Sequence, residues 1–135
     1  LICCQTLYAL SKGNSYARTA IGKEGGVSQI LQALEIHEND EITLAGLEAC
    51  DAVVQDHQAN QNIAAQGGAV PQIVEEMREH ANSEELCELA VKILVMLMDD
   101  EEEIIFQIQF YNSGGQEALE QCAASEGTKD LLRSY

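Results

Sequence analysis

Three histidines are the first residues that could do chemistry at neutral pH, because an imidazole can act as a general base or bind a metal. His37, His57 and His80 each fall in or beside an expected loop between helices, and none has a neighbouring Ser or Cys motif. His37 and His80 both follow an expected helix, where a protonated imidazole suits the negative end of the helix dipole. We therefore expect surface histidines and no catalytic residues.

The five cysteines are the next candidates, because thiolates bind metals and act as nucleophiles. They are Cys3, Cys4, Cys50, Cys87 and Cys122, with no CxxC pair and no histidine at zinc spacing. Two of them, Cys50 and Cys87, fall on apolar helical stripes, where a thiol acts as a small apolar side chain. We expect reduced thiols, no metal site and an intracellular location, cytoplasmic or also nuclear.

Two local patterns contain residue types found in ligand-binding loops but lack the spacing that such loops need. The five consecutive carboxylates of 99–103 lack the alternating ligands and turn glycine of a calcium loop. The stretch 22–26, Gly-Lys-Glu-Gly-Gly, lacks the order of glycine, lysine and hydroxyl residue that cradles phosphate. We predict no cofactor, no bound metal and no enzyme activity, which leaves the molecular surface as the functional part.

The net charge of the chain limits the kinds of molecule that it can attract as partners. Among 135 residues, 23 acidic side chains against 7 basic ones give a formal net charge of -16, which repels a phosphate backbone. We exclude nucleic acid and expect a protein or peptide partner, with a basic segment favoured, although an acidic surface is also a common device for solubility. The longest apolar run, 93–98, is too short to cross a bilayer, so we expect no membrane insertion.

An internal repeat positions these residues. Two small-residue breaks, Gly25-Gly26 and Gly68-Ala69, lie 43 positions apart, and each precedes an apolar stripe with the i, i+3, i+4, i+7 spacing of a helix. The two stripes are Val27, Ile30, Leu31 and Leu34, and Val70, Ile73, Val74 and Met77. Matching breaks and stripes predict an all-α protein in which each unit buries its stripe against its neighbours.

The predicted helices follow from these stripes and from capping residues. Asn39 or Asp40, and then Ser83, can accept the free backbone donors at the start of a long helix. The segment 104–111 alternates apolar and polar residues like a strand, but we predict a helix because a lone strand would have no partner. The predicted helices span about 2–12, 14–22, 27–36, 41–55, 61–66, a segment begun near Pro71, 84–98 and 104–111, followed after Gly114-Gly115 by a weaker second element whose apolar residues are Leu119, Cys122 and Ala123.

One domain, 1–135, is predicted from the length and the repeat. The chain begins at Leu1 inside an expected helix, which suggests a fragment of a longer protein. The face of Ile2, Cys3 and Leu7 would then be partly bare, and we expect self-association there. The expected subdivisions are the last helix of a truncated repeat, a first repeat, a second repeat and a partial or capping repeat, at 1–13, 14–56, 57–99 and 100–135.

The run Gly-Ala-Val-Pro-Gln-Ile-Val at 68–74 resembles the signature of the armadillo repeat family. The run at 25–31 matches it except that Ser28 replaces the proline, and Tyr-Ala-Leu-Ser at 8–11 is similar to the end of that family's third helix. The resemblance covers nearly the whole chain. It implies a right-handed α-α superhelix of three-helix repeats.

The resemblance also implies where a partner would bind. In this family the third helices line a concave groove that holds extended peptides, gripped by a Trp and by an Asn four residues later. The corresponding pairs here are Tyr8 with Lys12, Asp51 with Gln55, and Leu94 with Met98, so a usual nuclear-import receptor is not expected. The predicted partner-binding residues are Tyr8, Lys12, Glu48, Asp51, Gln55 and Leu94.

Two functions are consistent with these features. The first is a non-enzymatic interaction module that binds a partner protein or extended peptide along the concave third-helix surface. The alternative is a set of structural or regulatory scaffold repeats within a larger signalling or trafficking protein, with no ligand groove of its own.

Overall fold

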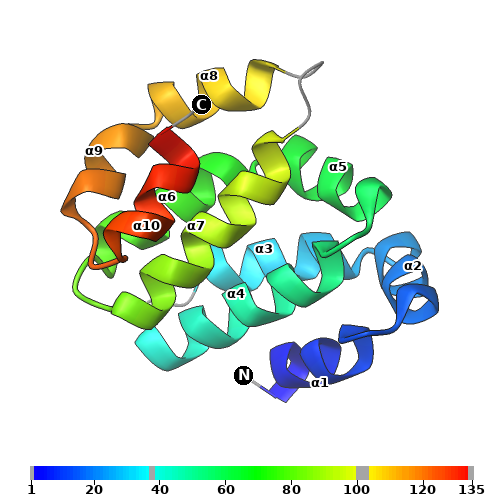
Figure 1. Cartoon of the computed structure of the whole chain (residues 1–135). Helices are drawn as coiled ribbons and strands as arrows, with labels where there is room; N and C mark the ends of the chain where they lie inside the picture. The colour runs from blue at the N-terminus through cyan, green and yellow to red at the C-terminus, as the bar shows by residue number, and fades with distance from the viewer. Residues whose placement is uncertain (1, 37–38, 100–103, 134–135) are drawn as a thin grey trace. The chain divides into compact units, whose positions relative to one another are not determined.

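The computed structural model describes residues 2–36, 39–99 and 104–133, and this part of the chain is helical throughout, without a strand (Figure 1). The helices are α1 (Ile2–Ser11), α2 (Ser15–Lys23), α3 (Gly26–Ile36), α4 (Asp40–Val54), α5 (Gln58–Gln66), α6 (Ala69–Glu79), α7 (Glu84–Met98), α8 (Ile104–Asn112), α9 (Gly115–Gln121) and α10 (Glu126–Arg133). The all-α prediction is confirmed, and α8 confirms the choice of helix over strand.

After α1 the helix lengths follow a recurring order. The helices α2, α3 and α4 have 9, 11 and 15 residues, and α5, α6 and α7 have the same three lengths. The last three, α8, α9 and α10, have 9, 7 and 8 residues. No helix was predicted for the residues of α10, so the third group of helices, α8 to α10, is more complete than expected.

Left-handed turns recur at equivalent positions. Gly25 and Gly68, which precede α3 and α6, have φ of 80° and 87°, a conformation that costs glycine little. Between a long helix and the next short one, Gly13 has φ of 70°, and Asp56, 43 positions later, has φ of 51°. Asp56 is the one non-glycine residue with positive φ among the described residues, so a side chain occupies a site that favours glycine.

Side-chain caps start the helices as predicted. The Asn39 side chain accepts a hydrogen bond from Glu41 N at 2.8 Å before α4, and Ser83 Oγ accepts one from Leu86 N at 3.4 Å before α7. Each cap satisfies one of the backbone donors that a helix start leaves free. The capping predictions are confirmed.

The described chain divides into two compact units, 1–69 and 70–135, and the division falls at the start of α6. It coincides with none of the three predicted repeat boundaries, and the prediction of one domain stays a prediction. In the first unit α1 packs beside α4, and α3 packs against both α4 and α5. The core of this unit is made by apolar side chains of α3 and α4, chiefly Val27, Ile30, Leu34, Leu47, Cys50, Val53 and Val54.

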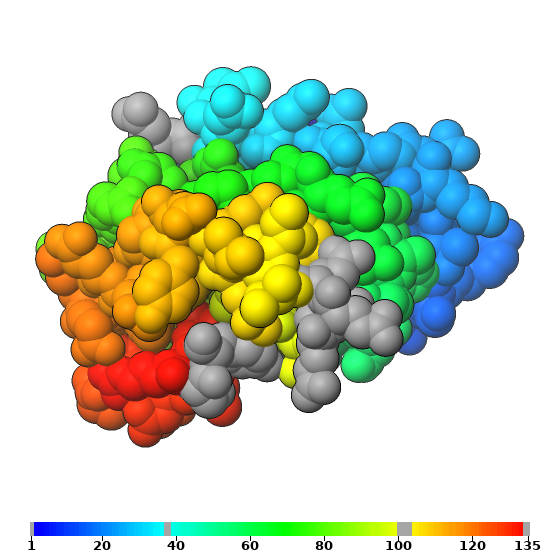
Figure 2. All heavy atoms as spheres, turned by 90° about the horizontal axis from the view of Figure 1, so that it is seen from above, coloured from blue at the N-terminus to red at the C-terminus, as the bar shows by residue number. Residues whose placement is uncertain are grey.

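In the second unit α7 packs against α8 and α10, and α9 packs against α8 and α10. Its buried side chains include those of the second predicted stripe together with Leu86, Ile93, Phe106, Phe110 and Leu119. Figure 2 shows α8, in yellow, and α9, in orange, on one surface of this unit. The exposed side of α8 carries large apolar side chains, Ile104, Ile105, Ile108 and Tyr111.

The first helix leaves several apolar side chains in solvent. Ile2 is 77% exposed, Cys3 and Leu10 are exposed, and Leu7 is half-buried. Self-association through this face stays a prediction.

His37 and the acidic residues 100–103 lie outside the described residues. Among the described helices, none combines the length and the apolar character needed to cross a membrane.

Candidate functional site

The predicted partner-binding residues of the first unit lie on two adjacent helices. Tyr8 is on α1, and Lys12 is the first residue after that helix. Glu48 and Asp51 are on α4, and Gln55 caps the C-terminus of α4. The two helices pack side by side and run in the same direction (Figure 1). We call these five residues together the α1–α4 surface.

The α1–α4 surface is partly accessible. Lys12 is exposed, and Tyr8, Glu48 and Gln55 are half-buried. The Lys12 ammonium lies 5.4 Å from the centroid of the Tyr8 ring, at the distance of a cation–π contact. Asp51 is only 9% exposed and belongs to the buried polar groups of the chain. A partner could therefore reach Lys12, Tyr8, Glu48 and Gln55, and Asp51 far less.

Leu94 is fully buried, with 0% of its surface exposed. Its helix, α7, packs against α10, which the sequence analysis did not predict. The assignment of Leu94 to a partner-binding surface is wrong in this structure, because a leucine packed within a core offers no contact area to another molecule.

The C-terminal end of α4 is held by side chains from other helices. A helix leaves its last four carbonyl groups without partners in the helix. Here Arg18 Nε donates to Ala52 O at 2.9 Å, Asn60 Nδ2 donates to Val53 O at 2.9 Å, and Gln61 Nε2 donates to Val54 O at 2.9 Å. Side chains of α2 and α5 therefore fix the helix that carries Glu48.

A hydrogen bond at the end of α1 recurs at the end of α4. Arg18 Nε also donates to Ser11 O, the last residue of α1, at 3.0 Å. Gln61 and Val54, the pair at the end of α4, lie 43 positions after Arg18 and Ser11. The same contact thus joins α2 to the end of α1 and α5 to the end of α4.

His57 has a structural role in the same region. Its Nδ1 accepts a hydrogen bond from Asn60 N at 3.2 Å, which caps α5, and its Nε2 lies 2.9 Å from Thr19 Oγ1. The side chain is half-buried, so the prediction of a surface histidine holds only in part.

A second cluster lies at the C-terminal end of α6. Glu76, Glu79 and His80 each offer one possible ligand atom, and these atoms all lie within 4.8 Å of one another. His80 is 8% exposed, so its predicted surface position is wrong. Glu76 is 2% exposed and was missed, although Glu, Glu and His at i, i+3 and i+4 share one helix face and could have been found in the sequence.

Two of the buried thiols, Cys50 and Cys87, are poor nucleophiles. All five cysteines lie within the described ranges and are free, and all but Cys3 are buried. Burial raises the pKa of Cys50 to about 12 and that of Cys87 to about 11. The neutral thiol is the stable form at these two positions, which agrees with their predicted place on buried helix faces.

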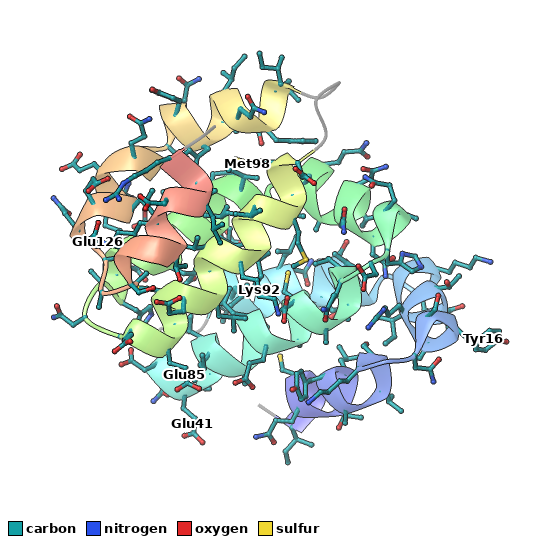
Figure 3. The ribbon with its side chains drawn as sticks, viewed as in Figure 1. Tyr16, Glu41, Glu85, Lys92, Met98 and Glu126 are labelled. Atoms are coloured by element: carbon teal, nitrogen blue, oxygen red, sulfur yellow. The ribbon has the colours of Figure 1, made fainter. Side chains whose placement is uncertain are left out.

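Part of the acidic charge has a local explanation. Glu41 and Glu85, in the first turns of α4 and α7, point away from their helices (Figure 3). A carboxylate near a helix N-terminus is stabilised by the positive end of the dipole. These side chains therefore support their own helices and need no partner.

Comparison with protein-family models, with curated proteins and with solved structures found no match for this chain. The resemblance to armadillo repeats consequently stays a prediction, and the proposals below depend on the residues and their geometry.

Proposed function

We propose that this chain is an armadillo-like module that binds an extended, basic segment of a partner protein on the α1–α4 surface, without catalysis. The observation that carries the proposal is the pairing of α1 with α4, which places accessible polar and aromatic side chains on two neighbouring helices. A right-handed superhelix of three-helix repeats is part of the same proposal.

The recurring contacts support the proposed architecture. Helices of 9, 11 and 15 residues occur twice in the same order, with left-handed glycines before α3 and α6. The bond from Arg18 to Ser11 O recurs 43 positions later as the bond from Gln61 to Val54 O. Repeated geometry of this kind is characteristic of solenoids, in which each unit packs on its neighbours.

The side chains favour a basic ligand with hydrogen-bonding groups. Glu48 supplies an accessible carboxylate, Gln55 can donate to or accept from a peptide backbone, and the Tyr8 ring offers an aromatic face. The net charge of -16 attracts a basic segment from a distance. Lys12 already lies over Tyr8, so a bound arginine or lysine would compete with it for the ring.

Fluorescence anisotropy with a labelled peptide of alternating Arg and Ser tests this proposal, and the matching Glu and Ser peptide is the control ligand. We expect the basic peptide to bind and Glu48→Lys to weaken it about fivefold, since an exposed ion pair contributes roughly 1 kcal/mol. Glu35→Lys is the matched variant, because Glu35 is exposed on α3 and changes the net charge equally. Equal losses in the two variants, or no binding, would contradict a specific surface.

The alternative, scaffold repeats without a groove, is favoured by one observation. Two of the predicted contact residues, Asp51 and Leu94, are buried, which reduces the area open to a ligand. Under this alternative, neither peptide binds, and Lys12→Glu and Glu48→Lys leave every association of the parent protein unchanged.

A further inference from the structure

The last turn of α6 and the residue that follows it, His80, bring together three side chains of types that can bind a metal. Glu76, Glu79 and His80 are spaced i, i+3 and i+4, so that all three side chains project over neighbouring turns. Their possible ligand atoms lie within 4.8 Å of one another. All three residues belong to the second unit.

The distance between two of these groups matches a coordination sphere. Glu76 Oε2 lies 3.5 Å from His80 Nε2. Ligands at about 2.0–2.1 Å from a tetrahedral metal are separated by roughly 3.3–3.4 Å. A cation between these two atoms would need only a small adjustment of the side chains.

Glu76 provides a second observation at this cluster. Its side chain is 2% exposed, and Oε1 accepts a hydrogen bond from Gln72 Nε2 at 2.9 Å. Its other oxygen, Oε2, is buried and accepts no hydrogen bond, and the His80 imidazole 3.5 Å away forms an ion pair with it only when protonated. A buried carboxylate oxygen without a donor is costly, and a bound cation would offset that cost.

The local charge also favours a cation. Glu75 and Glu79 place two further carboxylates beside Glu76 at the same end of α6. The basic side chain of this turn, Arg78, pairs with Glu75 and donates to Ser113 O at 2.7 Å. The negative end of the α6 dipole lies at the same place.

We propose that Glu76, Glu79 and His80 bind one divalent transition-metal ion, with Zn²⁺ the best match. One imidazole nitrogen with two carboxylate oxygens suits Zn²⁺, and a water can complete the tetrahedron. Glu79 is exposed, so the ion and its water reach the site from that side. The ion would tie the end of α6 to the turn that leads into α7.

Isothermal titration of the full chain with Zn²⁺, after removal of metal with a chelator, tests the proposal. We expect one site per chain, and we expect Glu79→Gln and His80→Gln each to weaken binding at least tenfold, because the loss of even an outer partner costs about 10–100-fold. Glu75→Gln is the matched control, since Glu75 is on the same turn and outside the cluster. Glu79 is exposed, so its variant keeps the test valid if His80→Gln fails to fold.

Replacement of Zn²⁺ by Co²⁺ separates this site from binding by thiols. We expect cobalt bands in the visible range without the intense near-ultraviolet band of a cobalt–thiolate bond, and we expect them unchanged in Cys3→Ser, the variant of the exposed cysteine. No uptake, equal affinity in Glu79→Gln and in the wild type, or a thiolate band that disappears in Cys3→Ser would overturn the proposal.

Discussion

Replacement of Asn60 should show how far one buried amide holds the first unit together. Asn60 is almost fully buried, and its Nδ2 donates to Arg18 O at 2.8 Å and to Val53 O at 2.9 Å. Arg18 lies inside α2, so its carbonyl keeps a helical partner in a variant. Val53 O does not, because His57 N, the donor four residues later, binds Val54 O instead.

The expected cost follows from these contacts. Asn60→Ala removes two hydrogen bonds of about 1 kcal/mol each, and a buried carbonyl without a donor adds roughly 1–3 kcal/mol. We expect the free energy of unfolding to fall by about 3–5 kcal/mol, a large share of the roughly 5–15 kcal/mol typical of a protein. Asn60→Asp should cost at least as much, because it places a second oxygen against the two carbonyl oxygens.

Urea unfolding followed by circular dichroism measures this loss. With a slope of about 2 kcal/mol per molar urea, the midpoint of the first unit's transition should fall by about 1.5–2.5 M. Gln58→Ala is the control. Gln58 is on the same helix, and the hydrogen bond from its side chain to Asn62 Oδ1 is exposed to solvent. A midpoint for Asn60→Asp equal to that of Gln58→Ala would refute the reasoning.

Three further changes test other contacts. Gly22→Ala would place a methyl group against Asn60 Oδ1, so we expect a loss of about 1–3 kcal/mol in urea unfolding that shrinks in an Asn60→Ala background; additive losses would argue against the contact. Asp56→Gly should raise the urea midpoint by the equivalent of about 0.5–1 kcal/mol, because Asp56 has positive φ, whereas a midpoint that falls would show that its side chain is needed. Hydrogen bonds from Thr128 Oγ1 and Ser125 N lower the pKa of Glu88, so the stability it contributes is present above pH 4.5 and is lost as the pH falls through the lowered value. Glu88→Gln should therefore reduce the acid-induced loss of the second unit's urea midpoint, and an unchanged pH profile would count against this linkage.

Much of the fold could be predicted from local patterns in the sequence. The i, i+3, i+4 stripes predicted the long helices, and α7 begins and ends at the predicted residues. Asn39 and Ser83 cap helices as expected, because a cap depends on backbone donors two or three residues away. These features involve neighbours in the chain, and the sequence displays them directly.

The candidate sites could be predicted less well. The positions on α1 and α4 follow from the repeat, and of the five predicted residues there Lys12 is exposed, three are half-buried and Asp51 is buried. Leu94 was misassigned because its burial depends on which elements pack around α7, and the stripe of one helix does not show that. The spacing of Glu76, Glu79 and His80 was present in the sequence, but spacing alone does not show that a glutamate is buried without a hydrogen-bond donor.

The sequence by itself determined the helices, their caps, the glycine turns and the 43-residue period, because each arises from interactions between residues close in the chain. Only the tertiary structure decided which polar side chains lose their water. Contacts with other parts of the fold, or with a neighbouring helix turn, bury Arg18, Asn60 and Glu76. Arg18 and Asn60 donate hydrogen bonds to backbone carbonyl groups of α4. Burial depends on packing between segments distant in sequence, and the period of one helix does not contain that information.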